Sequence, residues 1–322
     1  MKRMLFLGGL PVLCALFLSQ GVMVLATPIG SAEQTIHDPA APALDRAEAL
    51  MDARDGRHAM RMLDDVLEDY PTHRRALHLK VKLLATTGKL DEAQSIIDPL
   101  MQDQPVAAVT LYMQGLIYSR RNDWENALVY YKQAYPYGHD KYSINTITRA
   151  YLNVEGTDAT FAFLTAHLEK YPEESHVRLV RAKLYQSQHQ FEDARADYDA
   201  LVRAEPENPV PWKNLADMLI EQGDKRAVSH ARTACELAPK VPEIMVTLGR
   251  ALLAFGEAED ALAVLSDARK ARPRDPEIAY EYAVALFATG EAAEANTIMN
   301  TLAASDTAIG LRARRYLAAP KN

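Results

Sequence analysis

Histidines and carboxylates are the residues of this chain that could do chemistry, either as metal ligands or as acid and base catalysts. The nine histidines show neither His-x3-His spacing nor a Cys-x2-Cys partner. The acid pairs Asp91–Glu92 and Glu259–Asp260 fall where helices are expected to begin, and there they interact favourably with the helix dipole. Gly-x-Ser-x-Gly, phosphate-loop and His-Glu-x2-His motifs are all missing from the sequence. We therefore predict no enzyme activity, no metal and no cofactor.

Cysteine usage and charge narrow the remaining function classes. Cys14 lies in an apolar leader and Cys235 at an apolar position of an expected helix, so a mature chain keeps one thiol and forms no internal disulfide. Without the leader, 34 basic and 43 acidic residues give a net charge of −9. This balance argues against nucleic-acid or anionic-membrane partners, and it favours other proteins or peptides.

Residues 1–26 have the pattern of a signal peptide. Lys2 and Arg3 precede an apolar run from Leu5 to Ala26 that contains no acidic residue, and Val24-Leu25-Ala26 offers a cleavage site. The competing interpretation is an uncleaved N-terminal anchor, because the run is about long enough to cross a bilayer. We predict export to the periplasm with no membrane insertion after cleavage; the alternative is a membrane-anchored protein that faces the periplasm.

A repeat organises the rest of the chain. Alanines recur at intervals of 34, 34, 67, 33, 34 and 34 residues, and helix-ending prolines follow the same period. The interval of 67 conceals one degenerate repeat between Ala127 and Ala194. The recurring alanines are Ala59, Ala93, Ala127, Ala194, Ala227, Ala261 and Ala295.

This pattern resembles the tetratricopeptide repeat (TPR) family, whose 34-residue motif is W-x2-L-G-x2-Y, then A-x3-F, then P. A clear copy reads Met245-x2-Leu248-Gly249-x2-Leu252, then Ala261-x3-Leu265 and Pro273. The resemblance implies an all-α fold, a right-handed α-solenoid of about eight helix-turn-helix repeats with a C-terminal capping helix. Trp124 and Trp212 occupy repeat-pattern positions and are expected in the core.

The expected organisation follows from the period. We predict a signal peptide over 1–26, a linker over 27–39, the repeat solenoid over 40–309, and a capping helix with tail over 310–322. Arg312, Arg314 and Arg315 would give that terminal helix a polar outer face.

In the TPR family, the first helix of each repeat lines a concave groove through its second, fifth, ninth and twelfth positions. The resemblance therefore implies a polar groove suited to an extended peptide or an acidic segment of a partner, although ordinary solvated positions would give the same pattern. The candidate residues, with close neighbours included, are His78, Lys82, Tyr112, Ser119, Arg120, His176, Lys183, Lys213, Asn214, Asp217, Arg250, Glu277, Tyr280 and Glu281.

The function expected of an exported repeat protein without a catalytic motif is that of a scaffold in the bacterial cell envelope. The stretch from Asn214 to Leu302 is similar to bacterial TPR proteins linked to exopolysaccharide production and envelope protein sorting. Two alternatives stay open. One is a subunit of another envelope machine, for pilus assembly, outer-membrane protein assembly or cytochrome maturation; the other is a TPR regulator of a periplasmic enzyme.

Overall fold

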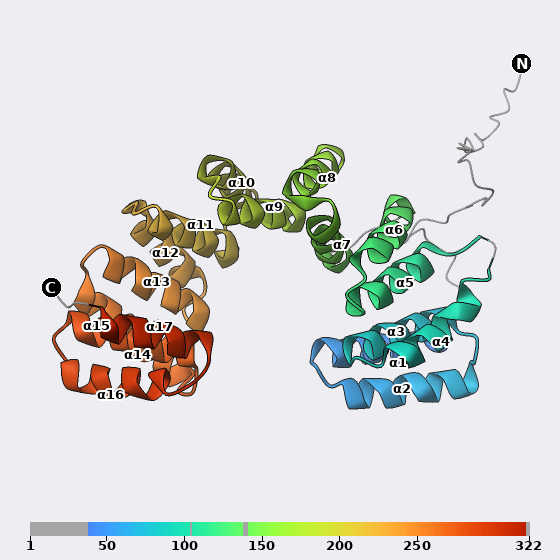
Figure 1. Ribbon diagram of the computed structural model, residues 1–322, viewed down its shortest axis with the longest axis horizontal. Helices are drawn as coiled ribbons and strands as arrows, with labels where there is room; N and C mark the ends of the chain where they lie inside the picture. Colours follow the sequence, from blue (N-terminus) through green and yellow to red (C-terminus); the bar gives the residue numbers. More distant parts are fainter. Residues whose placement is uncertain (1–37, 104, 138–140, 320–322) are drawn as a thin grey trace, which may run out of the picture. The chain divides into compact units, whose positions relative to one another are not determined.

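The computed structural model describes residues 38–103, 105–137 and 141–319. Within these ranges the chain forms 17 α-helices and one 3-10 turn, with no strand (Figure 1). It divides into two compact units, Met1–Thr160 and Phe161–Asn322, and the division falls inside one helix. The predicted signal peptide 1–26, and the predicted linker apart from its last two residues, lie outside the described residues.

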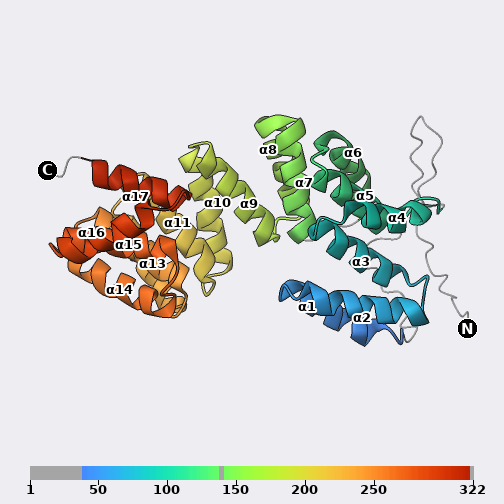
Figure 2. The same ribbon diagram turned by 60° about the horizontal axis from the view of Figure 1, so that its bottom comes forward.

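The N-terminal unit is built from consecutive pairs of helices. They are α1 (Ala41–Asp52), α2 (Gly56–Asp69), α3 (Arg74–Thr86), α4 (Leu90–Leu100), α5 (Ala108–Arg120), α6 (Trp124–Ala134), the 3-10 turn Tyr135–Tyr137, α7 (Lys141–Val154) and the start of α8 (Gly156–Lys170). Each of α1, α3 and α5 packs against the helix that follows it, as Figure 2 shows for α1 and α2. The first helices also pack against one another, α1 on α3, α3 on α5 and α5 on α7.

The C-terminal unit continues in the same way. Its helices after α8 are α9 (Ser175–Ser187), α10 (Phe191–Ala204), α11 (Pro209–Glu221), α12 (Arg226–Leu237), α13 (Pro242–Ala254), α14 (Ala258–Ala271), α15 (Pro276–Ala288), α16 (Ala292–Ala303) and α17 (Ala308–Ala318). Each of α9, α11, α13 and α15 packs against its successor, and α11, α13, α15 and α17 form a row of neighbouring first helices.

One left-handed residue marks the turn inside each helix pair. These residues have φ between +57° and +90° and recur every 33 or 34 positions. They are Arg54, Gly88, Asn122, Gly156, His189, Gly223, Gly256 and Gly290. Gly156 marks the degenerate repeat that the alanine pattern skips. Glycine suits this conformation because it has no Cβ, whereas Arg54 and His189 adopt it under strain.

Small residues let the two helices of a pair approach closely. All seven recurring alanines are fully buried. A Cβ on Gly249 of α13 would lie 2.5 Å from Leu265 Cγ of α14, and one on Gly115 of α5 would lie 2.7 Å from the Tyr131 ring of α6. Large apolar side chains from the facing helix occupy this space, which is why the pattern alternates small and large residues.

Local chemistry explains where the helices begin. Proline is the first residue of α11, α13 and α15, where its missing N–H costs no hydrogen bond. The acid pairs singled out above lie in the first turns of α4 and α14, as the helix-dipole interpretation predicts. The predicted all-α fold of about eight helix-turn-helix repeats with a C-terminal capping helix is confirmed. No helix in the described part of the chain is long and apolar enough to cross a bilayer.

Candidate binding grooves

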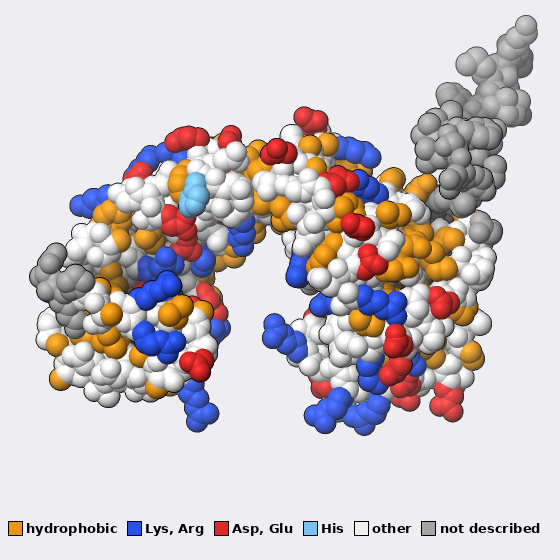
Figure 3. Space-filling view, viewed as in Figure 1, with side chains coloured by type: hydrophobic (Ala, Val, Ile, Leu, Met, Phe, Trp, Pro, Cys, Tyr) orange, Lys and Arg blue, Asp and Glu red, His pale blue; other side chains and the backbone are white. Residues whose placement is uncertain are grey.

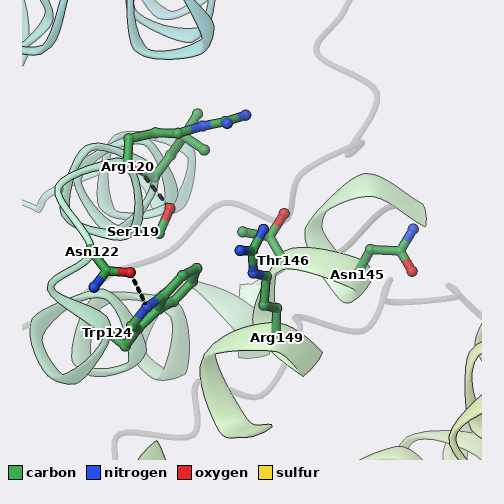
Figure 4. Close-up of a pocket in the computed structure, with 8 residues that line it drawn as sticks. Ser119, Arg120, Asn122, Trp124, Asn145, Thr146 and Arg149 are labelled. Carbon is green, nitrogen blue, oxygen red and sulfur yellow. Dashed lines mark hydrogen bonds between the residues drawn. The ribbon is translucent and has the colours of Figure 1, made fainter. Parts of the chain in front are cut away.

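A polar pocket of about 420 Å³ opens in the N-terminal unit (Figure 4). It lies between the C-terminal end of α5, the turn that follows, the first residue of α6 and one side of α7. Its lining residues are Leu116, Ser119, Arg120, Asn122, Trp124, Asn145, Thr146 and Arg149. This size is within the range of small-ligand pockets.

An aromatic ring and a guanidinium form one wall of this pocket. The Arg149 guanidinium carbon lies 4.9 Å from the centre of the Trp124 ring, a cation–π distance. The Trp124 Nε1–H donates to Asn122 Oδ1 at 2.8 Å, which holds the ring in place (Figure 4). The Tyr112 hydroxyl donates to Thr146 Oγ1 at 3.4 Å. The wall is therefore fixed by contacts that leave the guanidinium N–H groups of Arg149 available.

No carboxylate is among the described residues that line this pocket. Its two arginines, Arg120 and Arg149, form no ion pair with any part of the chain that the structure describes. Arg121, which follows Arg120 directly, does have an acidic partner, since its guanidinium donates to Asp91 at 2.9 Å. The pocket thus holds two positive charges that are not neutralised locally.

A second groove, of about 590 Å³, lies in the C-terminal unit on α11, α13, α15 and α17. Basic and acidic side chains are mixed on the face seen in Figure 3. The lining residues are Lys213, Asp217, Glu243, Val246, Thr247, Arg250, Arg272, Asp275, Glu277, Ile278, Glu281 and Arg312.

Every charge that lines this second groove has a partner of opposite sign. Asp217 accepts from Lys213 at 2.6 Å and from Arg250 at 3.1 Å. Arg312 of α17 donates to Glu277 at 2.8 Å and to Glu281 at 2.9 Å of α15. Arg272 forms ion pairs with Glu243 and Asp275. This network joins successive first helices and uses the charges internally.

Burial shapes the titration of the groove. Glu281 is 7% exposed, and burial raises its pKa, against the opposing effect of Arg250 and Arg312. The pKa of Lys183 on α9 is lowered, first by desolvation and then by repulsion from Lys213.

The structure brings some predicted groove residues together. Lys213, Asp217 and Arg250, with Glu277 and Glu281, line the C-terminal groove. Arg120 and Ser119 line the N-terminal pocket, in which Ser119 Oγ donates to the Leu116 carbonyl and accepts from Tyr131. Lys183 lies beside this C-terminal set without lining it.

Other predicted groove residues lie away from both pockets. His78, Asn214 and Tyr280 are only 8%, 7% and 9% exposed. His78 Nε2 lies 2.9 Å from Thr110 Oγ1, and desolvation lowers its pKa to about 4. The Tyr280 ring lies 4.3 Å below the Arg312 guanidinium.

The remaining three, Lys82, Tyr112 and His176, are half-buried. His176 Nε2 is 3.5 Å from Glu174 Oε2, and His167 Nε2 is 2.9 Å from the same oxygen. In the described ranges, no group of three or more histidine, cysteine or acidic side chains could hold a metal ion.

Sequence reasoning missed Asn145 and Arg149 because the fourth repeat begins one residue earlier than predicted, and it also left out Thr146 beside them. Helix α7 starts at Lys141, so Asn145 and Arg149 occupy its fifth and ninth positions, the same positions as Lys213 and Asp217 in α11. Trp124 was expected in the core but is half-buried and lines the pocket, because it is the first residue of α6 and only part of its ring packs. Arg312 was expected to face solvent at the chain end, whereas it pairs with α15.

Three family models of tetratricopeptide repeats match the chain. A tetratricopeptide repeat model matches residues 225–279 and 253–314, a second one matches 179–242, and the model of the psidin N-terminal TPR repeats region matches 49–154. Together these matches cover most of both units. The chain belongs to the tetratricopeptide repeat family. TPR proteins are generally non-catalytic scaffolds that bind other proteins or peptides.

Solved structures show the same TPR fold at low sequence identity. Yeast Tom70 matches with a TM-score of 0.63 and 16% identity over 89% of this chain and 65% of its own. A TPR protein from Parabacteroides merdae matches with a TM-score of 0.51 and 16% identity, over 77% of this chain and 98% of its own. A chain of the APC/C hetero-tetramer Cut9–Hcn1 matches with a TM-score of 0.54 and 15% identity, over 86% and 55%. A search of curated sequences finds no match.

Proposed function

We propose that this TPR protein is a non-catalytic scaffold of the bacterial cell envelope that holds peptide segments or subunits of other proteins, within exopolysaccharide production or export. The observation that supports it best is the repeated position of the pockets. In both units the described pocket is lined mainly by first helices, α5 and α7 in one and α11, α13, α15 and α17 in the other.

Repetition of this kind suits an extended ligand. Each first helix presents its fifth and ninth positions in the same direction, so a partner segment that lies across several repeats meets an equivalent set of side chains in each one. The Cut9–Hcn1 structure is a hetero-tetramer, so a protein of this fold takes part in a protein assembly. The envelope location rests on the leader-like residues 1–26.

The test is affinity purification of the full-length protein from its own cell envelope, with mass spectrometry of the co-purifying proteins and of its N-terminus. Recovery of polysaccharide-synthesis or export components on a chain that begins near Thr27 supports the proposal. Recovery of pilins, outer-membrane assembly factors or haem-handling proteins would instead assign the protein to that envelope machine. Recovery of a periplasmic hydrolase or synthase would favour a role as a regulator of that enzyme.

A matched pair of variants tests whether partner proteins bind on the side of the repeats that the first helices line. Arg250→Glu places a repelling charge beside Asp217 and Glu281 in the C-terminal groove, whereas Lys270→Glu changes an exposed residue of α14 outside both pockets. Loss of partners with Arg250→Glu alone supports groove binding. Equal retention by both variants would contradict it.

A further inference from the structure

The first helix pair, α1 and α2, carries arginines at positions where they cost stability. Arg54 has a φ of +62°, whereas the equivalent turn residue is glycine in five of the eight helix pairs. Arg57 lies in the first turn of α2, where the positive end of the helix dipole repels a cation. Departures of this kind from local preference are expected at functional sites.

Four arginines of this pair are exposed and have no carboxylate partner in the part of the chain that the structure describes. Arg46 is on α1 and Arg54 is in the turn, while Arg57 and Arg61 lie one helical turn apart on the same side of α2. In Figure 3, basic side chains project from the lower left edge of the N-terminal unit. The pair thus presents a set of positive charges to solvent.

Most acidic side chains of α1 already have a basic partner on the next helix. Arg75 of α3 pairs with both Asp45 and Glu48 of α1, and Lys80 of α3 pairs with Asp64 of α2 at 2.6 Å. The other acids of α2 lie in its C-terminal half, away from the turn. These acids are therefore not placed to neutralise the arginines near the turn.

At the turn itself, one acid is also in use. Asp55 accepts from the backbone N–H of His58 and lies 2.6 Å from the His58 ring nitrogen Nδ1. Among the described residues from Arg46 to Arg61, this leaves Asp52 as the acid without a partner. The turn end of the pair therefore holds an excess of unpaired positive charge, although the whole chain has a net charge of −7.

The position of these arginines suits an extended anionic surface better than a small anion. Neither described pocket includes any of them, and a small ligand needs a concave site. The apolar side chains Ala59, Leu63 and Val66 of α2 are buried against the rest of the unit. Contact through this surface is therefore electrostatic, without insertion of apolar side chains.

We propose that the turn end of the α1–α2 pair docks on an anionic phospholipid bilayer, whose phosphate groups the four arginines contact. A bilayer is favoured over nucleic acid because residues 41–69 contain no Phe, Tyr or Trp on which bases could stack. The leader-like residues 1–26 also end only 14 residues before α1, at most about 50 Å of extended chain. This membrane contact goes beyond the proposed scaffold function.

Binding is measured with the chain from Thr27, the predicted mature form, which keeps every described residue. It is mixed with vesicles of equal phosphatidylglycerol and phosphatidylcholine, or of phosphatidylcholine alone. We expect binding to the anionic vesicles only, and weaker binding as the salt concentration rises. Combined Arg54→Gln, Arg57→Gln and Arg61→Gln should weaken it roughly a hundredfold, because each arginine near an anionic surface contributes a factor of about five.

The matched control combines Arg203→Gln, Arg274→Gln and Arg315→Gln. These arginines of the C-terminal unit are also exposed and also have no carboxylate partner among the described residues, so the change in net charge is the same. The control should bind within about twofold of the unchanged chain, since its arginines lie outside the docking surface. An equal loss in both triple variants overturns the proposal, because net charge alone would then explain binding.

Two results with the unchanged chain also overturn it. One is equal binding to anionic and neutral vesicles, or binding to neither. The other is binding of inorganic polyphosphate with no binding of the anionic vesicles, which would assign the arginines to a soluble polyanion.

Stability separates docking from a purely structural role of the arginines. Arg54→Gly relieves the left-handed strain and Arg57→Gln removes a cation from the start of α2, so each should raise the urea midpoint of the N-terminal unit. Each should also weaken vesicle binding. Trp124 fluorescence in a Trp212→Phe chain measures the midpoint. Lower midpoints in both variants would assign these arginines to folding and overturn the proposal.

The two proposals fail separately. If envelope partners co-purify while the chain binds no anionic vesicle, the docking surface is wrong and the scaffold stands. If the arginines of the first pair mediate vesicle binding while no envelope protein is retained, the docking surface stands and the scaffold is wrong.

Discussion

The two pockets use the same helix positions and similar residue types, but their charges are in opposite conditions. In the C-terminal groove four cations face five carboxylates, and each is paired within the unit. In the N-terminal pocket the two arginines are surrounded by amide, hydroxyl, apolar and aromatic side chains, with no carboxylate among the lining residues described. Arginine at a groove position is therefore not by itself a sign of binding, because its neighbours decide whether its hydrogen bonds are already used.

The ion pairs of the two units also differ in how deeply they are buried. In the C-terminal unit, Asp197 of α10 has a side chain that is 5% exposed and accepts from Arg181 of α9 at 2.8 Å. The ion pairs described between Arg, Lys and acidic residues of the N-terminal unit are well exposed, as for Arg121 with Asp91. Trp124 and Trp212, the two tryptophans of the chain, lie one in each unit and can report on each separately.

The largest expected difference comes from the buried pair. Asp197→Ala leaves Arg181 and Arg178 without their carboxylate and should lower the free energy of unfolding of the C-terminal unit by about 3–5 kcal/mol. Urea unfolding followed by Trp212 fluorescence in a Trp124→Phe chain measures it. Asp91→Ala, followed by Trp124 in a Trp212→Phe chain, is the control and should leave its midpoint unchanged. A small effect of Asp197→Ala would remove the contrast in burial.

Acid should destabilise the N-terminal unit through His78. Its pKa is lowered from 6.5 to about 4 by burial, so the unfolded chain binds more protons between these values. Stability is then full above about pH 6.5 and falls by about 3 kcal/mol as the pH drops towards 4. Unfolding midpoints by Trp124 fluorescence across this range measure the slope, which His78→Gln should reduce.

Glu281 gives the opposite sign in the C-terminal unit. Its raised pKa means that the folded state keeps a proton that the unfolded chain has lost, so its contribution falls as the pH rises above the ordinary value of 4.5. Unfolding midpoints are measured across the same pH range by Trp124 and by Trp212 fluorescence. The same pH dependence in both units would contradict the expected difference in sign.

Helix approach should be less tolerant in the N-terminal unit. In Gly115→Ala the new Cβ lies 2.7 Å from the fully buried Tyr131 ring and 3.1 Å from the Ala127 carbonyl oxygen, so we expect a loss of about 2 kcal/mol. In Gly249→Ala the nearest atoms all belong to the Leu265 side chain, which is aliphatic and more adaptable than a tyrosine ring, so the expected cost is about 1 kcal/mol. Urea unfolding of both variants checks the order, and equal losses would show that Tyr131 yields as readily as Leu265.

The smallest expected effect comes from a substitution that makes the C-terminal groove resemble the N-terminal pocket. Asp217→Asn keeps the shape but removes the shared partner of Lys213 and Arg250, and it should cost about 1 kcal/mol of stability. Lys213 then loses its carboxylate partner and Arg250 keeps only Glu281, at 4.0 Å, so the groove should gain affinity for a fluorescently labelled peptide of alternating glutamate and alanine. Asp267→Asn, whose partner Lys270 lies outside the groove, is the control. No gain in peptide affinity would show that pairing does not explain the difference between the pockets.

Much of the fold followed from the sequence, because the period of small residues fixes which helices pack. The recurring alanines, the helix-starting acids and the closing helix are all found as predicted. The site followed less well. A shift of one residue at the start of α7 hid Arg149. Arg250 pairs with carboxylates 33 and 31 positions away in the sequence, whereas Arg120 has no such partner among the described residues. The sequence period reflects which residues pack between helices. It does not indicate which charged side chains form ion pairs across helices.

The left-handed turn residues have a further consequence, for inheritance. A genetic crossover that joins two neighbouring ones, Gly256 to Gly290 for example, removes or adds one whole helix pair and still leaves a left-handed residue at the junction. A deletion of another length that falls inside a helix would rotate part of its apolar side out of contact. Loss and duplication in units of 33 or 34 residues are thus changes in length that preserve the packing of the remaining helices, and each changes the reach of the groove by one first helix.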